Sequence, residues 1–217
     1  MNVRFYFLLL ICMARMPLPA LSQTDSLCHC LFKAYTDGEI ILKDKRVVRT
    51  KLNYDAYNQI LFYQDGKQEK YMYRMANVDT IRIGGRLFIP YRNRLLECCP
   101  VADGDTLLVD WKCKAKHLGV KGPMGTYTQS GGIASVDMMR LQRKGIDWDR
   151  QTYYYTFFYR NTYSYPIGGR RKKFSSSKSF LRLFPKQKQQ EWKKRIRALR
   201  TDFKDPNDIV SLLEGGL

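Results

Sequence analysis

A basic segment in the C-terminal third contains the residues of this chain best suited to binding a charged partner. Between Gly168 and Arg200 the sequence has 13 lysines and arginines and one acid, Glu191, so this segment carries +12 of the formal net charge of +18. Positive charge at this density attracts phosphate, carboxylate or sulfate groups on a polymer or a surface. The cations that we expect to bind an anion are Arg170, Arg171, Lys172, Lys173, Lys186, Lys188, Lys193, Lys194, Arg195 and Arg197.

Aromatic side chains are interleaved with these cations and leave two interpretations open. Phe174, Phe180, Phe184 and Trp192 have the ring faces needed to stack on bases or sugars. Alternatively, the cations form a solvated helix face and the aromatic rings pack on the rest of the domain, which is the commoner meaning of a charge run.

The segment Cys28-His29-Cys30 has the side-chain types of a zinc site, which Cys113 and His117 could complete. On an extended strand Cys113 and His117 lie about 13 Å apart, at ~3.3 Å per residue, which is too far for one tetrahedral ion. We therefore expect no metal and no other cofactor.

Disulfide bonding is the interpretation that we favour for the cysteines, with Cys28, Cys30, Cys98 and Cys99 as candidates. Neighbouring Cys98 and Cys99 point to opposite faces of a strand, so each needs its own partner. Cys113 is expected to face the core. The pairing cannot be assigned from the sequence.

Carboxylates provide the alternative of an enzyme that acts on envelope glycan or peptide. Glu97 is surrounded by apolar residues, which raises the pKa of a general acid, although it could instead point outward or pair with an arginine. Asp147 and Asp149 flank Trp148, as in some sugar-cleaving sites, but a solvated turn is the commoner meaning. We assign no catalytic residue.

The first 22 residues, MNVRFYFLLLICMARMPLPALS, predict a secretory signal peptide that is cleaved before Gln23. Its removal would take away Cys12, leaving five cysteines, and would lower the net charge from +18 to +16 because it contains Arg4 and Arg15. No later apolar run has the roughly 20 residues of a membrane helix. We expect a protein in the periplasm, on the outer membrane or secreted.

The elements that must position these residues are mostly short strands. Asp-Gly pairs at 37–38, 65–66 and 103–104 predict turns, and alternation over 107–117 predicts a strand with Leu107, Val109, Trp111 and Cys113 on one face. In the hairpin around Gly84-Gly85, a three-residue turn that pairs Ile83 with Leu87 would keep the apolar face intact. Residues 119–135 are expected to form a loop, and Tyr153–Tyr165 to form a strand that turns at a second Ile-Gly-Gly-Arg, 167–170.

Three helices are predicted after residue 175. Ser176 or Ser177 caps the first, Pro185 opens the second, and Asp205-Pro206 opens the third. The predicted fold class is α+β, mainly β. An antiparallel meander, either a sandwich or a half-open barrel, spans residues 23–175, and a helical segment at 176–217 packs on it.

The runs DGEIILKDKRVVRTKLNY, VDTIRIGGRLFIPY and KSFLRLFP, together with GPMGTYTQSGG, resemble an uncharacterised group of exported β-rich proteins of Bacteroidota. The resemblance covers most of the chain after residue 22. It implies an envelope location and a β-rich fold with terminal helices, and it carries no activity and no functional residue.

The sequence therefore predicts a non-catalytic binding module of the envelope. Its cationic C-terminal face would meet an acidic protein, a glycan or an anionic membrane surface, whereas export disfavours nucleic acid. The alternatives are the envelope hydrolase described above and a structural or assembly subunit.

Overall fold

The computed structural model describes residues 29–101, 104–121, 127–128 and 153–214, and the description below concerns these residues. Ten antiparallel strands form one sheet in the order β13-β12-β8-β7-β6-β5-β1-β2-β3-β4. Its strands are β1 (Thr36–Leu42), β2 (Val47–Asp55), β3 (Ile60–Asp65), β4 (Gln68–Met72), β5 (Val78–Ile83), β6 (Arg86–Tyr91), β7 (Arg94–Pro100), β8 (Thr106–Asp110), β12 (Thr162–Ile167) and β13 (Arg170–Phe174). The predicted class, mainly β with C-terminal helices, is confirmed.

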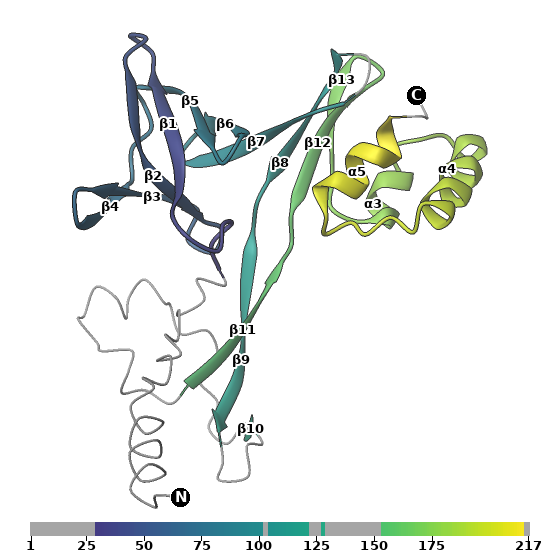
Figure 1. The fold of residues 1–217 in the computed structure, drawn as a ribbon. Helices are drawn as coiled ribbons and strands as arrows, with labels where there is room; N and C mark the ends of the chain where they lie inside the picture. Colours follow the sequence, from purple (N-terminus) through teal and green to yellow (C-terminus); the bar gives the residue numbers. More distant parts are fainter. Residues whose placement is uncertain (1–28, 102–103, 122–126, 129–152, 215–217) are drawn as a thin grey trace, which may run out of the picture.

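A second, three-stranded sheet continues from the first. It consists of β10 (Tyr127–Thr128), β9 (Cys113–Lys121) and β11 (Tyr153–Tyr159), in that order. β9 follows β8 and β11 precedes β12, so the two pairs form one long two-stranded ribbon that leaves the main sheet (Figure 1).

One face of the ten-stranded sheet is apolar across nearly all its strands. Ile40, Ile81, Phe88 and Val109 lie on this face and are almost completely buried, and the registers place them on neighbouring strands. The sheet is not closed, because β4 and β13 are both edges. The main sheet is therefore an open antiparallel meander.

Three helices complete the same core at one end of the sheet: α3 (Ser177–Leu181), α4 (Lys186–Ala198) and α5 (Pro206–Leu213). Ser176 caps α3 through a capping box, and Asp205 caps α5 with Pro206 in its first turn, as predicted. Pro185 is the N-cap of α4. No helix among the described residues is long and apolar enough to cross a bilayer.

The predicted three-residue turn at Gly84-Gly85 is wrong. Ile83 pairs with Arg86 and Ile81 with Phe88, so the turn has two residues, and both glycines have positive φ angles of 55° and 79°. Glycine adopts this backbone at no steric cost, which favours the tight hairpin. The two-residue turn consequently places Arg86 on the apolar face of the sheet. The predicted three-residue turn would have left this face without a charged residue at that position.

Two further expectations about turns and loops need correction, and one is confirmed. Asp37-Gly38 lies inside β1, and residues 119–121 and 127–128 belong to strands, whereas 122–126 and 129–135 lie outside the described residues. The second Ile-Gly-Gly-Arg does form a hairpin turn, with Ile167 paired to Arg170. The predicted strand over 153–165 is divided between β11 and β12.

Gly38 is in a strand because its neighbours leave no room for a side chain. A Cβ atom at this position would lie 2.6 Å from the Arg82 carbonyl oxygen and 2.6 Å from a methyl group of Leu52. The first of these is backbone of the adjacent strand, so it cannot rotate away. Gly38 thus permits the close pairing of β1 with β5.

We expect Gly38→Val to lower the free energy of unfolding by about 3 kcal/mol, because overpacking outweighs the strand preference of valine. Urea unfolding followed by circular dichroism measures the change. Thr80→Val on the neighbouring strand β5 is the control, with an expected change within about 0.5 kcal/mol. A Gly38→Val variant as stable as the natural chain would contradict this account.

Candidate functional site

The predicted anion-binding cations fall into three groups, of which the first is a stripe along α4. At about 100° per residue, Lys186, Lys193 and Arg197 lie within roughly 40° of one another around the helix, and Lys194 flanks them. All four side chains are exposed. The stripe is about 16 Å long at 1.5 Å per residue, and it faces away from buried Trp192.

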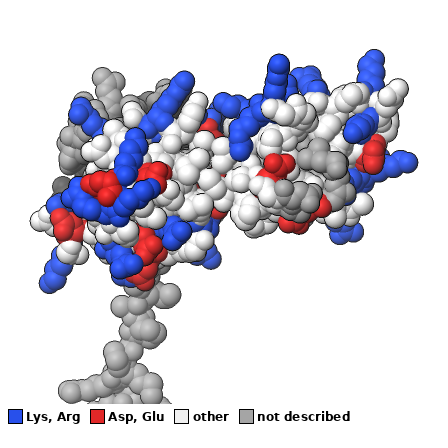
Figure 2. Space-filling model, turned by 90° about the horizontal axis from the view of Figure 1, so that it is seen from above, with Lys and Arg blue, Asp and Glu red and all other residues white. Residues whose placement is uncertain are grey.

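The cations of this α4 stripe differ from those at the other end of the sheet. Lys186, Lys193, Lys194 and Arg197 make no ion pair with any acid that the structure describes. By contrast, the cations of β1–β4 and their turns are mostly paired, as in Lys45–Asp79, Arg46–Asp44, Lys51–Asp37 and Lys70–Asp65. In Figure 2, blue and red side chains adjoin at the strand end, and blue side chains project from several edges of the helical end, with red ones among them.

Lys188 and Arg195 form the second group, on the opposite flank of α4. Arg195 donates from Nε to the Leu212 carbonyl oxygen at 2.9 Å and from Nη2 to the Ser211 carbonyl oxygen at 3.4 Å. These carbonyls end α5, where a helix carries partial negative charge. Arg195 therefore ties α4 to the end of α5 and is not part of the exposed stripe.

The third group lies on β13, the edge strand of the main sheet. Arg170, Arg171, Lys172 and Lys173 are all exposed there. Arg171 reaches across the sheet and donates to the carbonyl oxygens of Thr106 and Ser164 at 3.3 and 3.2 Å. Charged side chains on an edge strand oppose pairing with other chains, so this group has a sufficient structural role.

The four interleaved aromatic residues belong to the core. Phe174, Phe180, Phe184 and Trp192 are each at most 7% exposed. Phe180 contacts the other three, with ring centroids 5.0 to 5.1 Å apart. The suggestion that these rings stack on bases or sugars is therefore wrong, and the alternative of packing against the domain is confirmed.

Glu97 is buried on the apolar face of β7 and is held by two side chains. Its carboxylate accepts from Arg86 Nε at 2.6 Å, from Arg86 Nη2, and from Trp111 Nε1 at 2.6 Å. The Arg86 guanidinium lies 5.2, 5.6 and 5.1 Å from the ring centroids of Phe32, Phe88 and Trp111. Of the alternatives for Glu97, pairing with an arginine is confirmed and pointing outward is wrong.

A carboxylate held in this way is poorly placed for general acid catalysis, because both of its oxygens already accept hydrogen bonds from Arg86 and Trp111. The sequence did not identify which arginine pairs with Glu97. The hairpin register, which places Arg86 on the same face, is the signal that identifies it. Asp147 and Asp149, the other acids considered, lie outside the described residues.

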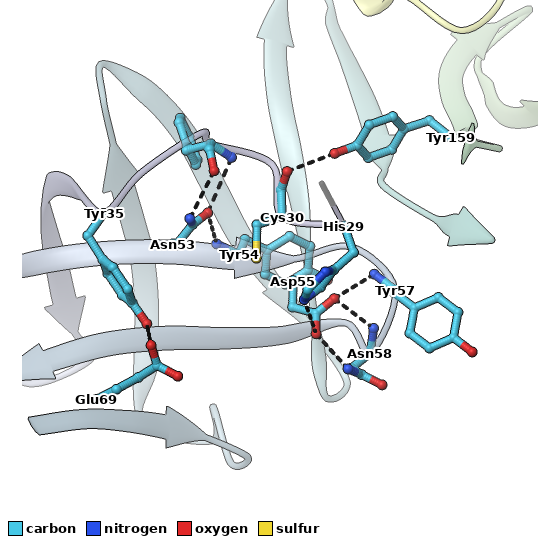
Figure 3. Close-up of polar contacts among 11 residues, drawn as sticks. His29, Cys30, Tyr35, Asn53, Tyr54, Asp55, Tyr57, Asn58, Glu69 and Tyr159 are labelled. Carbon is cyan, nitrogen blue, oxygen red and sulfur yellow. Dashed lines mark hydrogen bonds and ion pairs between the residues drawn. The ribbon is translucent and has the colours of Figure 1, made fainter. Parts of the chain in front are cut away.

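His29 and Cys30 lie against the end of β2 (Figure 3). Asp55, which is fully buried, accepts from the backbone of Tyr57 and Asn58 at 2.8 and 3.0 Å and lies 3.8 Å from His29 Nε2. Tyr159 donates to the Cys30 carbonyl oxygen at 2.8 Å. These contacts give His29 and Asp55 a structural role at the turn between β2 and β3.

No group of three or more His, Cys, Asp or Glu side chains within the described ranges could hold a metal ion. Cys30 and Cys113 are buried, and Cys113 faces the core as expected. Cys28 lies outside the described residues. The disulfide expectation for Cys28 and Cys30 stays a prediction.

Cys98 and Cys99 are free thiols in the structure. Burial, followed by the Glu97 carboxylate, raises the pKa of Cys99 from its usual 9.0 to about 12. Burial also raises the pKa of Cys98. Because the thiolate is the form that attacks disulfides, both residues are poorly reactive near neutral pH.

A separate cluster of three arginines escaped the sequence analysis. Arg74, Arg92 and Arg94 line a cleft of about 560 Å³ between the β2–β3 turn, the end of β4 and the β6–β7 turn. The sequence signal for this cluster is the pair of short segments Tyr-Met-Tyr-Arg at 71–74 and Tyr-Arg-Asn-Arg at 91–94, which both combine tyrosine with arginine. It was missed because the charge outside the basic segment is close to balanced as a whole.

Comparisons of the chain with protein-family models, with curated proteins and with solved structures give no match. Function must therefore be inferred from the geometry of the chain itself.

We expect Glu97→Gln to lower the free energy of unfolding by about 3 kcal/mol, because it leaves the largely enclosed Arg86 cation without its partner. Thermal or urea unfolding measures this. Glu39→Gln, which breaks surface pairs with Arg49 and Arg82, should cost at most about 1 kcal/mol. The double variant Arg86→Met/Glu97→Gln should lose less than Glu97→Gln alone, and equal losses for Glu97→Gln and Glu39→Gln would rule out a special role for the buried pair.

The stability of the fold should decrease at alkaline pH. The folded chain holds the Cys99 proton up to a pKa of about 12, whereas the unfolded thiol loses it near 9.0. The contribution is therefore complete below pH 9 and is lost as the pH rises from 9 towards 12. With allowance for partial exposure of Cys99, the stability lost by pH 10 amounts to about 1 kcal/mol.

Urea unfolding at pH 7, 9 and 10 tests this, with Cys99→Ala as the matched variant. Cys99→Ala should lose less stability between pH 9 and pH 10 than the natural chain does. Identical losses in the two proteins would show that other groups, such as buried Tyr54 and Tyr163, whose pKa values burial also raises, account for the whole decrease.

Proposed function

We propose that this protein is a non-catalytic binding module whose α4 stripe meets an anionic polymer or surface. The observation that carries the proposal is the unpaired state of Lys186, Lys193, Lys194 and Arg197 on one exposed helix face, where no described acid pairs with them. Unpaired charges on a straight helix face are free to contact phosphate or carboxylate groups without first breaking an ion pair.

Recognition by this stripe is electrostatic. The neighbouring aromatic rings are buried in the core, so the stripe offers charge without stacking surfaces. Binding of this kind depends strongly on salt and discriminates little among anions. Acidic glycans, acidic proteins and anionic lipid headgroups are all partners with the required chemistry.

An envelope location fits this role. The predicted signal peptide at 1–22 and the resemblance to exported proteins of Bacteroidota support it, and export disfavours nucleic acid as the partner. Envelope hydrolysis has less support, because Arg86 and Trp111 hold Glu97, the one candidate acid in the described part of the chain.

Two variants of equal charge test the proposal. One neutralises the α4 stripe with Lys186→Gln, Lys193→Gln, Lys194→Gln and Arg197→Gln. The other neutralises four paired cations at the strand end with Lys45→Gln, Arg46→Gln, Lys51→Gln and Lys70→Gln. Both remove four positive charges from the same chain, so they separate the position of the charge from its amount.

The natural chain and the strand-end variant should bind a heparin column and vesicles containing phosphatidylglycerol, and the stripe variant should lose about 100-fold or more in vesicle affinity. This follows from about 1 kcal/mol per cation near an anionic surface. Vesicles of phosphatidylcholine alone are the control for charge. Equal losses in the two variants, binding that ignores salt, or binding to neither anionic surface would overturn the proposal.

A further inference from the structure

The arginine cleft beside β4 is a second cationic site, independent of the α4 stripe. Its arginines come from two places far apart in sequence, Arg74 after β4 and Arg92 and Arg94 at the β6–β7 turn. Among the described residues, no acid lines the cleft. β4 and α4 lie at opposite sides of the molecule (Figure 1), so the two sites are separate.

The inner arginine of the cleft is held in place from behind. Arg94 Nη2 lies 3.3 Å from Asp110 Oδ2, and its guanidinium lies 5.4 Å from the Tyr91 ring centroid. Its Nε is buried and has no hydrogen-bond partner. Asp110 and the Tyr91 ring thus fix the guanidinium at the cleft, while its Nε has no partner among the described residues.

The outer arginines are available to a ligand. Arg74 and Arg92 are exposed and neither forms an ion pair with a described acid. The Arg92 guanidinium lies 5.6 Å from the centroid of the Tyr91 ring, which is the ring that the Arg94 guanidinium also contacts. Three guanidinium groups around one cleft suit a carboxylate or another planar oxyanion, which arginine binds through paired hydrogen bonds.

The remaining lining suits a sugar. Asn58 donates from Nδ2 to Asp55 and Gln59 donates from Nε2 to Asp110, at 2.6 and 3.2 Å, so both amide carbonyl oxygens are left to accept from hydroxyl groups. Tyr73, which is 55% exposed, lines the cleft, and Tyr71 beside it is 43% exposed. Exposed tyrosines provide flat apolar surface beside the charges, and a sugar ring has an apolar face to place on it.

Backbone strain gathers at the same place. Gln59 and Arg92 both have positive φ angles, 59° and 57°, although neither is glycine. Residues with such backbone angles are strained, and they tend to cluster at binding sites. Both of these strained residues line the cleft.

From this geometry we infer that the cleft binds a saccharide bearing a carboxylate, with Arg74, Arg92 and Arg94 on the acid and Asn58, Gln59 and Tyr73 on the sugar. The inference does not depend on the proposed function, because it uses none of the α4 cations. A cleft of about 560 Å³ has room for one to two sugar rings.

Isothermal titration with digalacturonate tests the inference in the full chain, both natural and carrying the four α4 substitutions given above. The substituted chain removes any contribution of the α4 stripe. Saturable binding should persist in it, and either Arg74→Gln or Arg92→Gln should weaken the affinity about tenfold or more. Arg46→Gln, which removes an exposed cation elsewhere, is the matched control and should change it little.

Three comparisons make the result decisive. The methyl ester of digalacturonate, which lacks the charge, should bind at least tenfold more weakly, and glucose 6-phosphate should bind more weakly than digalacturonate. The inference is overturned if digalacturonate does not bind the α4-substituted chain, if the ester binds equally well, or if glucose 6-phosphate binds better. It is also overturned if Arg74→Gln and Arg92→Gln have no larger effect than Arg46→Gln.

Discussion

The buried ion pair between Arg86 and Glu97 is the interaction on which the open ten-stranded sheet depends. It lies on the apolar face of the main sheet, where an unpaired charge would be strongly unfavourable. Trp111 donates a further hydrogen bond to Glu97, and aromatic rings surround the guanidinium. The pair therefore joins β6, β7 and the end of β8 through contacts that only one register allows.

That register follows from the turn and the pair together. A two-residue turn at Gly84-Gly85 places Arg86 on the apolar face. The carboxylate of Glu97 lies on the same face of the next strand. A three-residue turn would place Arg86 within the loop itself. The local preference of the glycines for positive φ and the distant requirement of Glu97 for a cation thus select the same structure, which is the agreement expected of a sequence that specifies one fold.

The sequence contains enough information for the fold class and the helices, because these depend on local signals. Alternation over 107–113, the Ser176 and Asp205 caps, and the second Ile-Gly-Gly-Arg turn all had their predicted consequences. The register at Arg86 and the position of Gly38 inside β1 could not be read in this way. Both depend on what lies across the sheet, an acid in one case and a backbone carbonyl in the other.

The contrast between local signals and contacts across the fold also applies to charge. The distribution of charged residues along the sequence is therefore a poor guide to their distribution on the folded surface. The basic segment of the sequence separates in the structure into an exposed α4 stripe, an edge strand and Arg195, which is used internally at the end of α5. The arginine cleft is assembled from two segments, around Arg74 and around Arg92 and Arg94, that lie outside the basic segment. Availability of a cation depends on whether an acid lies within reach after folding. No described acid pairs with the α4 stripe, Arg74 or Arg92, whereas Arg94 is held by Asp110. A search for binding sites in a basic protein of this kind should therefore begin with the unpaired cations rather than with the most basic stretch of sequence.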